Sequence, residues 1–440
     1  MKIIHCLNHF FPFHNAGTEI YSLSLVQELL KKNMECIFVI PNFRKNITEE
    51  YQVKGVRVIK YAEPSVSDRA LQMGKRKPDG LEAFLHVLKM ESPSIVHFHE
   101  FTSGNGISIH HIVAAKQNGY NVLMTFHLAG YSCKTGHLMY KDRELCSGMI
   151  DIKKCTDCVF TVKELSAVKK SLLYRSAMLA YNFNYDTTAW ESNLGTAIGY
   201  PFIIKKTKDD LLKLAEACNR LVVLTDWYKK ILLLNGLPEN KITCIKQGLP
   251  VGIRLVTKTR IPVDVLSVVF IGRINELKGI HLLIAAIRQL NPDKIRLDIY
   301  GDYTADEFSL NCKAQTTSFE NIIWRGSIDP ENVTDTISKY DVLCLPSLTE
   351  MSPLVIQEAF AVAVPVLASD IYGNAEQVSD NVNGWLFKFN SSDDLKIKLQ
   401  QLIDDPEKIA QAKQKIPATR SFAEVADEYE KLYNDILLKP

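Results

Sequence analysis

The chain has 440 residues and a formal net charge of +2, so it is long enough for two or three domains and lacks the strong positive charge of a nucleic-acid-binding protein. No apolar run approaches the roughly 18 to 20 residues that span a bilayer. The first residues, MKIIHCLNHFFPF, predict a β-strand rather than a signal peptide. Several of the ten cysteines lie in apolar segments, as buried thiols do in a reducing compartment, so we expect a soluble cytoplasmic protein.

Strand-like and helix-like segments alternate along the chain. In the first half, strands are predicted at residues 2–7, 36–40, 56–61, 94–97, 121–126, 221–224 and 242–245. In the second half, they are predicted at residues 266–271, 295–300, 322–325, 342–345, 366–368 and 385–387. Strands separated by helices indicate parallel sheets with right-handed crossovers. The predicted fold class is therefore α/β, with two doubly wound, Rossmann-like domains.

The pause in this pattern near residues 250–263 predicts a linker. We expect an N-terminal domain over residues 1–252, with a cysteine-rich insertion at 130–160, and a second domain over residues 253–420. A final helix at 421–440 is expected to return to the N-terminal domain. Ligands of such sheets bind at the carboxyl ends of the strands, so the residues there are the first candidates for a site.

The segment LCLPSLTEMSPLVIQEAFAVA, residues 343–363, predicts an anion-binding helix at such a strand end. Ser352 and Pro353 are expected to begin the helix, because Ser is a good N-cap and Pro is favoured at the first helical position. The first amides of the helix, from Pro353 to Val355, have no partner inside the helix and lie at the positive end of its dipole. We therefore expect an anion to bind there.

Two carboxylates flank the predicted helix start. Glu350 lies in the loop before the helix, and Glu358 lies on the helix, about 7 Å below its mouth at roughly 1.5 Å per residue. Helical side chains lean towards the N-terminus, so Glu358 can reach back towards a ligand at the mouth. One carboxylate at the mouth and one below it suit a phosphorylated ligand with hydroxyls on both sides, such as a nucleotide sugar.

A second anion-binding pattern follows the first strand of the second half. Residues 272–279 read GRINELKG, in which Gly272 allows a tight turn and Arg273 and Lys278 bring two cations to the strand's carboxyl end. Arg binds a diphosphate through its planar fork, and Lys binds it as a point charge. Such a pair alone most often belongs to a solvated loop, but beside the two carboxylates it favours a diphosphate site.

These residues also carry a family resemblance. The spacing G-R-x4-K-G followed by E-x7-E, and then ASDIYGNAEQV and NVNGWLF, resembles the family 4 retaining glycosyltransferases with the GT-B fold. The resemblance covers nearly the whole chain and is strongest from Val268 to Phe387. It implies two Rossmann-like domains that face each other across a cleft, the first on the acceptor side and the second holding the nucleotide sugar.

The resemblance implies a role for each residue of the two patterns. Arg273 and Lys278 would bind the donor diphosphate. Glu358 would hold the ribose hydroxyls, and Glu350 would face the 3- and 4-hydroxyl region of the donor sugar. The backbone amides expected to complete the phosphate cradle are those of Pro353, Leu354 and Val355.

Two loops of the N-terminal domain are expected to face this donor site. In residues 12–19, family members often have two adjacent glycines that let backbone amides approach the phosphates, whereas this chain has Ala16 and Gly17, so only Gly17 keeps full φ freedom. The second loop begins at His127, directly after a predicted strand. A lone His is more often structural, but the resemblance implies that His127 contacts the donor sugar. Family members often have Asp next, where this chain has Leu128.

Four cysteines follow that loop closely, namely Cys133, Cys146, Cys155 and Cys158. Their pattern, C-x12-C-x8-C-x2-C, lies in a turn-rich segment rather than in a strand. A C-x2-C pair with two further thiols is what a closed, tetrahedral structural zinc site requires. The alternatives are reduced thiols, a disulfide pair and an Fe–S cluster. A metal would fix a long acceptor-side loop whose ordering is otherwise costly in entropy.

Residues 160–206 are both apolar and basic. Helical spacing would place cations, among them Lys163, Lys169 and Arg175, beside an apolar face. The segment is either a core-packed helix with a solvated face or a surface for a lipid-linked acceptor or an anionic membrane. The second interpretation predicts peripheral association with the inner face of the plasma membrane.

The sequence therefore predicts a retaining hexosyltransferase that uses a UDP- or GDP-sugar and a glycan or lipid-linked acceptor, with surface polysaccharide biosynthesis as the context that the resemblance implies. No DxD-like motif stands at a strand end to hold Mg²⁺ on the diphosphate, so we expect metal-independent catalysis without a cofactor. The candidate catalytic residues are His127, Arg273, Lys278 and Glu350. The alternatives are a GT-B phosphorylase, a non-catalytic nucleotide-sugar-binding protein that supports a partner enzyme, and a zinc-stabilised interaction module.

Overall fold

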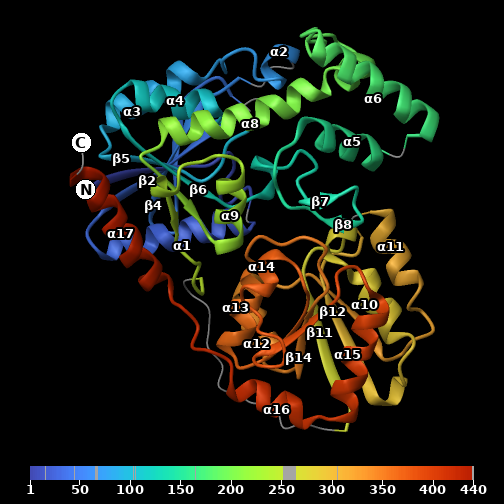
Figure 1. Cartoon of the computed structure of the whole chain (residues 1–440). Coiled ribbons are helices and arrows are strands. Elements are labelled where there is room, and N and C mark those ends of the chain that lie inside the picture. Colours follow the sequence, from blue (N-terminus) through green and yellow to red (C-terminus); the bar gives the residue numbers. More distant parts are fainter. Residues whose placement is uncertain are drawn as a thin grey trace. The chain divides into compact units, whose positions relative to one another are not determined.

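The structure, a computed structural model, describes residues 1–14, 16–43, 45–64, 68–102, 104, 106–163, 165–250, 264–304 and 306–438 (Figure 1). The chain forms two compact units. The first contains residues 1–246 together with the chain from Phe422 onward, and the second contains Gln247–Ser421. The predicted linker lies, from residue 251, outside the described residues, as do the predicted boundary between residues 252 and 253 and Asn15 of the first predicted loop.

The first unit is built on an eight-stranded sheet in which neighbouring strands pair in parallel, except that the edge strand β3 runs antiparallel to β4. In spatial order, the strands are β10 (Ile242–Cys244), β9 (Arg220–Val223), β6 (Asn121–Phe126), β5 (Ile95–Phe98), β1 (Lys2–Cys6), β2 (Glu35–Asn42), β4 (Val56–Ala62) and β3 (Glu49–Val53). A separate two-stranded ribbon pairs β7 (Met139–Tyr140) with β8 (Glu144–Leu145).

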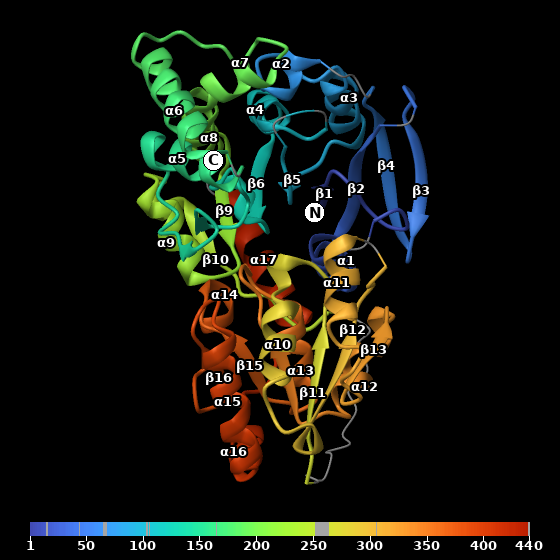
Figure 2. The same cartoon turned by 90° about the vertical axis from the view of Figure 1, so that its right-hand side faces the viewer.

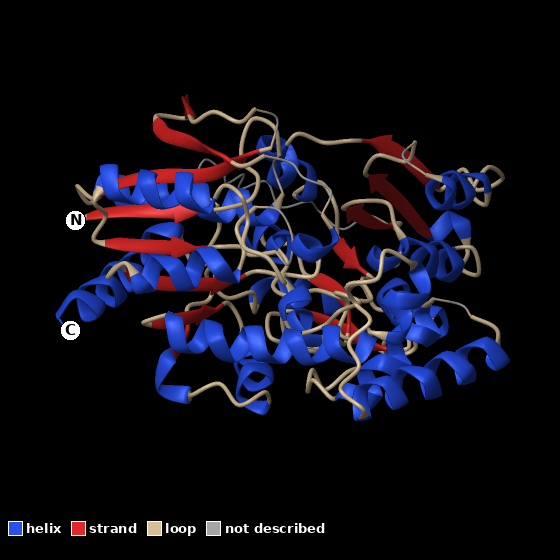
Figure 3. Cartoon of the chain, turned by 90° about the horizontal axis from the view of Figure 1, so that it is seen from above, coloured by secondary structure: helices blue, strands red, loops and turns tan. Residues whose placement is uncertain are grey.

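Helices flank the strands of this unit (Figure 3). They are α1 (Gly17–Lys31), α2 (Arg69–Gln72), α3 (Leu81–Glu91), α4 (Ile109–Gln117), α5 (Ile152–Val162), α6 (Ala167–Asn182), α7 (Asn193–Ile198), α8 (Tyr200–Ala217), α9 (Asp226–Leu234) and α17 (Phe422–Leu438). The last of these, α17, packs against α1. Its buried residues recur every three or four positions, as one apolar face of a helix requires.

The second unit has a six-stranded sheet in which all neighbouring strands of the described chain are parallel. In spatial order, its strands are β13 (Ile322–Gly326), β12 (Ile295–Tyr300), β11 (Leu266–Ile271), β14 (Val342–Leu345), β15 (Val366–Ser369) and β16 (Gly384–Phe387). Its helices are α10 (Ile280–Ile287), α11 (Glu307–Ala314), α12 (Val333–Ile337), α13 (Leu354–Ala361), α14 (Tyr372–Ala375), α15 (Ser392–Asp404) and α16 (Glu407–Gln414).

The central strands are apolar runs because helices cover both faces of each sheet. β5, β14 and β15 are buried at every position, which is the pattern expected of interior parallel strands. Every strand predicted from the sequence is present, with its ends within two residues of the predicted ones. Within the described ranges, no helix combines the length and the apolar character needed to cross a membrane.

Candidate functional site

Two loops of the second unit meet at the carboxyl edge of its sheet. β11 and β14 are neighbouring parallel strands, with Val268 opposite Val342, so the loops that follow them leave the sheet side by side. The backbone N–H of Leu348 donates to the carbonyl oxygen of Leu277 over 2.7 Å and joins the two loops. The cationic loop after β11 and the acidic loop after β14 therefore form one continuous surface.

A glycine makes this close approach possible. Gly279 follows the short 3₁₀ helix η3 (Glu276–Lys278) and has a left-handed φ of 68°. A Cβ atom on Gly279 would lie 1.9 Å from the carbonyl oxygen of Pro346. Any other residue at this position would push the two loops apart.

Lys278 and Glu350 form an ion pair between the two loops. Lys278 Nζ lies 2.5 Å from Glu350 Oε1, and the hydroxyl of Ser347 donates to the same oxygen over 2.9 Å. Only 10% of the Glu350 side chain is exposed. The sequence assigned Lys278 to a diphosphate and Glu350 to a sugar, and the structure places the two in direct contact.

Arg273 is the second cation of this surface. Its side chain is exposed, and none of the described residues forms an ion pair or a hydrogen bond with it. An exposed guanidinium that no described residue bonds, beside the Lys278–Glu350 pair, is available to an anionic ligand.

Helix α13 begins at Leu354, one residue later than predicted. Pro353 precedes its first turn with φ −70° and ψ 124°, and no side chain caps the helix. Proline has no backbone N–H, so the expectation that Pro353 contributes an amide to a phosphate cradle is wrong. The N–H groups that helix geometry leaves without an internal acceptor are those of Leu354, Val355 and Ile356.

Glu358 lies on α13 and is half-buried, and no described residue forms a hydrogen bond or an ion pair with its carboxyl. Burial raises the pKa of this carboxyl to about 7. An ionised carboxylate without a partner is unfavourable in such a position. A ligand that donates hydroxyl groups to Glu358 would relieve this cost, so the side chain suits a diol such as a ribose.

In the first unit, Glu19 holds the loop before α1. Its buried carboxylate accepts from the backbone N–H of Ala16 over 2.9 Å and lies 2.7 Å from His14 Nδ1. Gly17, the first residue of α1, does not adopt a left-handed φ, and no atom lies within 4 Å of the place where its Cβ would be. Gly17 therefore does not use the φ freedom of glycine. Its lack of a side chain leaves open space beside the first turn of α1.

His127 directly follows β6 and is buried. Its Nε2 lies 3.1 Å from His99 Nδ1, and His99 Nε2 lies 3.0 Å from His5 Nδ1, so the three imidazoles form a hydrogen-bonded row. The ring of Tyr21 packs edge-on against His127. Burial lowers the pKa of His127 to about 3, so its imidazole is neutral at neutral pH. Since no described residue bonds its Nδ1, that atom is left for a ligand.

Among the described residues, His5, His97 and His99 are the one group of three potential metal ligands whose ligand atoms lie within 4.8 Å of one another. Most of their nitrogens are already used. His97 bonds Tyr433 and Thr125, and His99 bonds its two neighbours in the histidine row. Within the described chain, only His5 Nε2 in this group lacks a partner, so the cluster is a buried polar network rather than a metal site.

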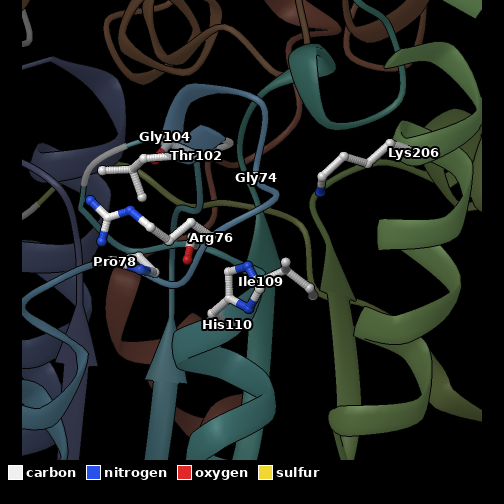
Figure 4. A pocket seen from close by; sticks show the side chains of 10 residues that line it. Gly74, Arg76, Pro78, Thr102, Gly104, Ile109, His110 and Lys206 are labelled. Carbon is white, nitrogen blue, oxygen red and sulfur yellow. The ribbon is translucent and has the colours of Figure 1, made fainter. Parts of the chain in front are cut away.

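The first unit also has a polar pocket between α2, α4 and α8 (Figure 4). Its lining residues are Leu71, Gly74, Arg76, Pro78, Thr102, Gly104, Ser108, Ile109, His110 and Lys206. The two cations are already neutralised: Arg76 pairs with Asp68 and Asp79, and Lys206 pairs with Asp210. We assign no ligand to this pocket.

Sequence reasoning missed several residues that shape the site. Ser347 bonds Glu350, and the side-chain amide of Gln247 donates to the carbonyl of Ser352. Gly373 packs so tightly that a Cβ would lie 2.0 Å from the carbonyl oxygen of Met351. Gly373 could have been found from the sequence, because it is the glycine inside the motif ASDIYGNAEQV. No sequence pattern marks Ser347 or Gln247 as part of the site.

The comparison with protein families matches most of the second unit to a known family. Residues 254–419 match the family described as Glycosyl transferases group 1. An uncharacterized 41.2 kDa protein in the cps region of Klebsiella pneumoniae is 23% identical over 242 residues, which are 53% of this chain and 62% of that protein. The amylovoran biosynthesis glycosyltransferase AmsK of Erwinia amylovora is 27% identical over 206 residues, which are 44% of this chain and 49% of that protein. The matches thus span less than two thirds of either relative.

Solved structures show the fold of the whole chain. Sucrose-phosphate synthase from Thermosynechococcus elongatus is similar with a TM-score of 0.68 at 16% identity, covering 100% of both chains. Anabaena Alr3699/HepE, in complex with UDP and glucose, is similar with a TM-score of 0.61 at 13% identity, covering 99% of this chain and 100% of that chain. The protein has the GT-B fold of glycosyltransferases. The predicted resemblance to GT-B glycosyltransferases is confirmed at the level of the fold, and residues 254–419 match the group 1 family model, whereas family 4 stays a prediction.

Proposed function

We propose that this protein is a retaining glycosyltransferase that transfers a hexose from a UDP- or GDP-sugar to a glycan or lipid-linked acceptor in surface polysaccharide biosynthesis. The observation that carries the proposal is the convergence at one sheet edge of Arg273, the Lys278–Glu350 pair, the first-turn amides of α13 and the carboxyl of Glu358. The cations and amides suit a diphosphate, and the carboxyl suits a diol. The group 1 match over this unit, the UDP bound by Alr3699/HepE and the polysaccharide named for AmsK support it.

In this proposal, the site stabilises the leaving group. Arg273, Lys278 and the amides compensate the negative charge that develops on the diphosphate as its bond to the sugar breaks, and such preorganised donors are usually the largest catalytic contribution. The acceptor hydroxyl attacks the face that the diphosphate leaves, and its proton passes to the diphosphate, so the anomeric configuration is retained. Glu350 is not assigned as a nucleophile, because Lys278 and Ser347 already hold one of its oxygens. His127 is assigned to a polar contact with the sugar.

A thermal-shift titration with UDP, GDP and ADP tests nucleotide binding. A ligand at 100 times its Kd should stabilise the fold by about 2.7 kcal/mol. We expect a shift with UDP or GDP in the wild type, no shift in Lys278→Ala, and an unchanged shift in Lys294→Ala, which removes an exposed lysine of the same unit. If none of the three nucleotides shifts the wild type, the proposed donor site is wrong.

Turnover separates an enzyme from the alternative, a non-catalytic nucleotide-sugar-binding protein that supports a partner. Leu128, at the position where family members often have Asp, motivates this alternative and is 48% exposed. We expect the nucleotide to be released only when an acceptor is present, and this release should continue in the presence of EDTA. The anomeric configuration of the product, determined by NMR, should be the same as that of the donor sugar. Binding of the nucleotide sugar without release, with any glycan or lipid-linked acceptor, would favour the alternative.

A separate observation supports a membrane-bound acceptor. α6 and the residue that follows it expose four large apolar side chains, Val168, Leu172, Leu179 and Phe183, at 79%, 66%, 59% and 77%. Their spacing of four, seven and four residues places them along one face of the helix. The helix carries no Asp or Glu, and Arg175 lies exposed between Leu172 and Leu179 on the same face.

The other face of α6 is packed within its own unit. Ala177 is fully buried there with Val159 and Phe160, and the helix rests on α5 and α8, at the outside of the unit (Figure 2). An apolar stripe with cations and no acids suits an anionic lipid surface. We infer that α6 lies on the membrane that presents the lipid-linked acceptor.

Vesicle sedimentation tests this role of α6. We expect the wild type to bind phosphatidylglycerol vesicles at low salt, to bind less at high salt, and to ignore neutral phosphatidylcholine vesicles. Replacing Leu172 and Leu179 with Asp should abolish binding, whereas Leu234→Asp, at an exposed leucine of α9, should not. If the wild type does not bind anionic vesicles at low salt, or if α6 instead pairs two copies of the chain in solution, the inference is wrong.

A further inference from the structure

Four cysteines of the first unit line a single cavity. Cys133 follows the 3₁₀ turn η1 (Ala129–Tyr131), Cys146 follows β8, and Cys155 and Cys158 lie on α5. The cavity has a volume of about 30 Å³, which is more than one water molecule needs. All ten cysteines of the chain are free thiols, and the other six are dispersed in and around the two sheets.

The local fold brings the four thiols together from three segments. Cys155 and Cys158 are three residues apart on α5, so their side chains share one face of the helix. The ribbon of β7 and β8 lies near α5 (Figure 1), and it returns the chain so that the backbone N–H of Cys146 donates to the carbonyl of Leu138 over 2.9 Å. Each of its strands has two residues, so the ribbon has too few hydrogen bonds and contacts to be stable by itself.

Polar groups of the backbone and of one side chain contact two of the four sulfurs, and Cys158 Sγ also donates to the carbonyl oxygen of Met139 over 3.6 Å. The backbone N–H of Lys141 donates to Cys158 Sγ over 3.1 Å, from a turn in which Lys141 and Asp142 both have left-handed φ angles. The hydroxyl of Thr135 lies 3.2 Å from Cys133 Sγ. The bond from the Lys141 N–H stabilises a thiolate at Cys158 more than a thiol.

The charge around the cavity is positive. Lys134 and Lys154 both line it, and no Asp or Glu is among its lining residues. A divalent ion held by four thiolates has a net charge of −2, which would compensate the two lysines.

We propose that Cys133, Cys146, Cys155 and Cys158 bind one structural Zn²⁺ ion in a tetrahedral, four-thiolate site. On binding, four S–H bonds break, four Zn–S bonds form and four protons pass to the solvent. Among the described residues, no three of these sulfur atoms lie within 4.8 Å of one another. Zn–S bonds of about 2.3 Å require sulfur–sulfur separations of about 3.8 Å, so the thiols close around the ion. The ion then fixes the segment between η1 and α5.

Metal analysis of the full-length wild type, purified without chelators, tests the site directly. We expect about one equivalent of zinc, released in proportion as a mercurial reagent titrates the four thiols. Replacement by Co²⁺ should give the visible bands of tetrahedral cobalt together with sulfur-to-cobalt charge transfer. Neither readout depends on glycosyltransferase activity, so the failure of this proposal is distinguishable from failure of the proposed function.

A pair of variants connects the metal to the cysteines. Cys155→Ser should lose zinc and have a lower unfolding temperature, whereas Cys312→Ser, at a buried cysteine of α11, should keep its zinc. Wild-type protein without metal and with four reactive thiols would overturn the proposal. A disulfide among the four in non-reducing mass spectrometry, or bound iron with the absorption of an Fe–S cluster, would overturn it as well.

Discussion

The carboxyl of Glu358 has a pKa of about 7 because burial opposes its ionisation and no described residue donates a hydrogen bond to it. Glu350, in the loop before the same helix, is in the opposite situation, because Lys278 and Ser347 both form hydrogen bonds with its carboxylate. The two carboxylates, to which the sequence resemblance already gives different roles, therefore also differ in their surroundings. Glu350 is a fixed part of the loops, and Glu358 is available to a ligand.

The raised pKa of Glu358 predicts a pH-dependent affinity for the nucleotide sugar. Ribose hydroxyls donate to the ionised carboxylate, whose population rises about tenfold between pH 6 and pH 8 for a pKa of about 7. We expect affinity to rise by up to about tenfold over this range in isothermal titration calorimetry. The suitable ligand is a sugar conjugate of the nucleotide that gives the thermal shift, because the diphosphate of such a conjugate does not titrate in this range. Glu358→Gln should bind more weakly, with an affinity independent of pH.

Stability provides an independent check on the same side chain. A folded pKa raised above the unfolded value of 4.5 means that the stabilising contribution is complete below pH 4.5 and is lost as pH rises through 7. Glu358→Gln should therefore unfold at a higher urea concentration than the wild type at pH 8, and at a similar one at pH 4. Equal midpoints at pH 8, with a pH-independent wild-type affinity, would show that Glu358 is not the unpartnered acid described above.

The residues of the site were predictable where the signal is local, and not where it depends on pairing. Arg273, Lys278 and Glu358 stand out because a strand, a turn and a helix start lie next to them in the sequence. The row from His5 through His99 to His127 joins residues that are 94 and 28 positions apart in the sequence. No spacing rule connects such residues, because only the order of strands β1, β5 and β6 in the sheet brings them together.

At the scale of elements, the contact between the loops after β11 and β14 depends on Gly279. Gly279→Ala combines a left-handed φ with a Cβ that would lie 1.9 Å from the Pro346 carbonyl oxygen. We expect it to reduce the unfolding free energy of the second unit by about 2–4 kcal/mol and to abolish the nucleotide-induced thermal shift.

Gly326→Ala is the matched control for this prediction. Gly326 also has a left-handed φ, of 78°, but no atom lies within 4 Å of the place where its Cβ would be. Its substitution should cost only the backbone strain, about 1 kcal/mol in urea unfolding, and should keep the shift. Equal costs for the two variants would mean that the close approach of the loops is not what Gly279 provides.

The elements that the sequence did not predict have weak local patterns. β3 reads EEYQV, with two charges and alternating exposure, because it is an antiparallel edge strand with one face in solvent. β7 and β8 have two residues each, too few for any periodicity. α13 starts one residue late because Pro353 adopts an extended ψ, although Ser-Pro is a favourable helix start. Strands β11, β12 and β14 have the predicted ends because most of their positions are buried and each follows a clear local change in apolar character.

At the scale of the whole molecule, the first unit is completed by the last helix of the chain. Tyr433 on α17 lies 2.8 Å from His97 Nδ1, and Tyr429 lies 2.9 Å from the Thr125 hydroxyl. Removal of residues 422–440 would leave these buried polar groups unpaired and expose the apolar core against α1. We expect the truncated protein to lose protease resistance in residues 1–246 and to keep it in the second unit, as mapped by limited proteolysis and mass spectrometry.

Lys32→Ala is the control for the truncation. Lys32 reaches from the end of α1 to Asp427 and Glu430 of α17, but these are surface ion pairs. The variant should therefore digest like the wild type. A truncated protein with a first unit as resistant as that of the wild type would show that α17 only covers a surface that is already complete.

The position of α17 also sets the order in which the protein matures on the ribosome. Residues 1–246 emerge first, but they lack the helix that finishes their core until the continuous second unit, Gln247–Ser421, has been synthesised. At roughly 5–20 residues per second, that delay is on the order of 10–40 s. During this time the nascent first unit exposes the apolar face that α17 will cover, and such a surface favours aggregation or binding by a chaperone. The unit that is translated first is therefore the one that is finished last.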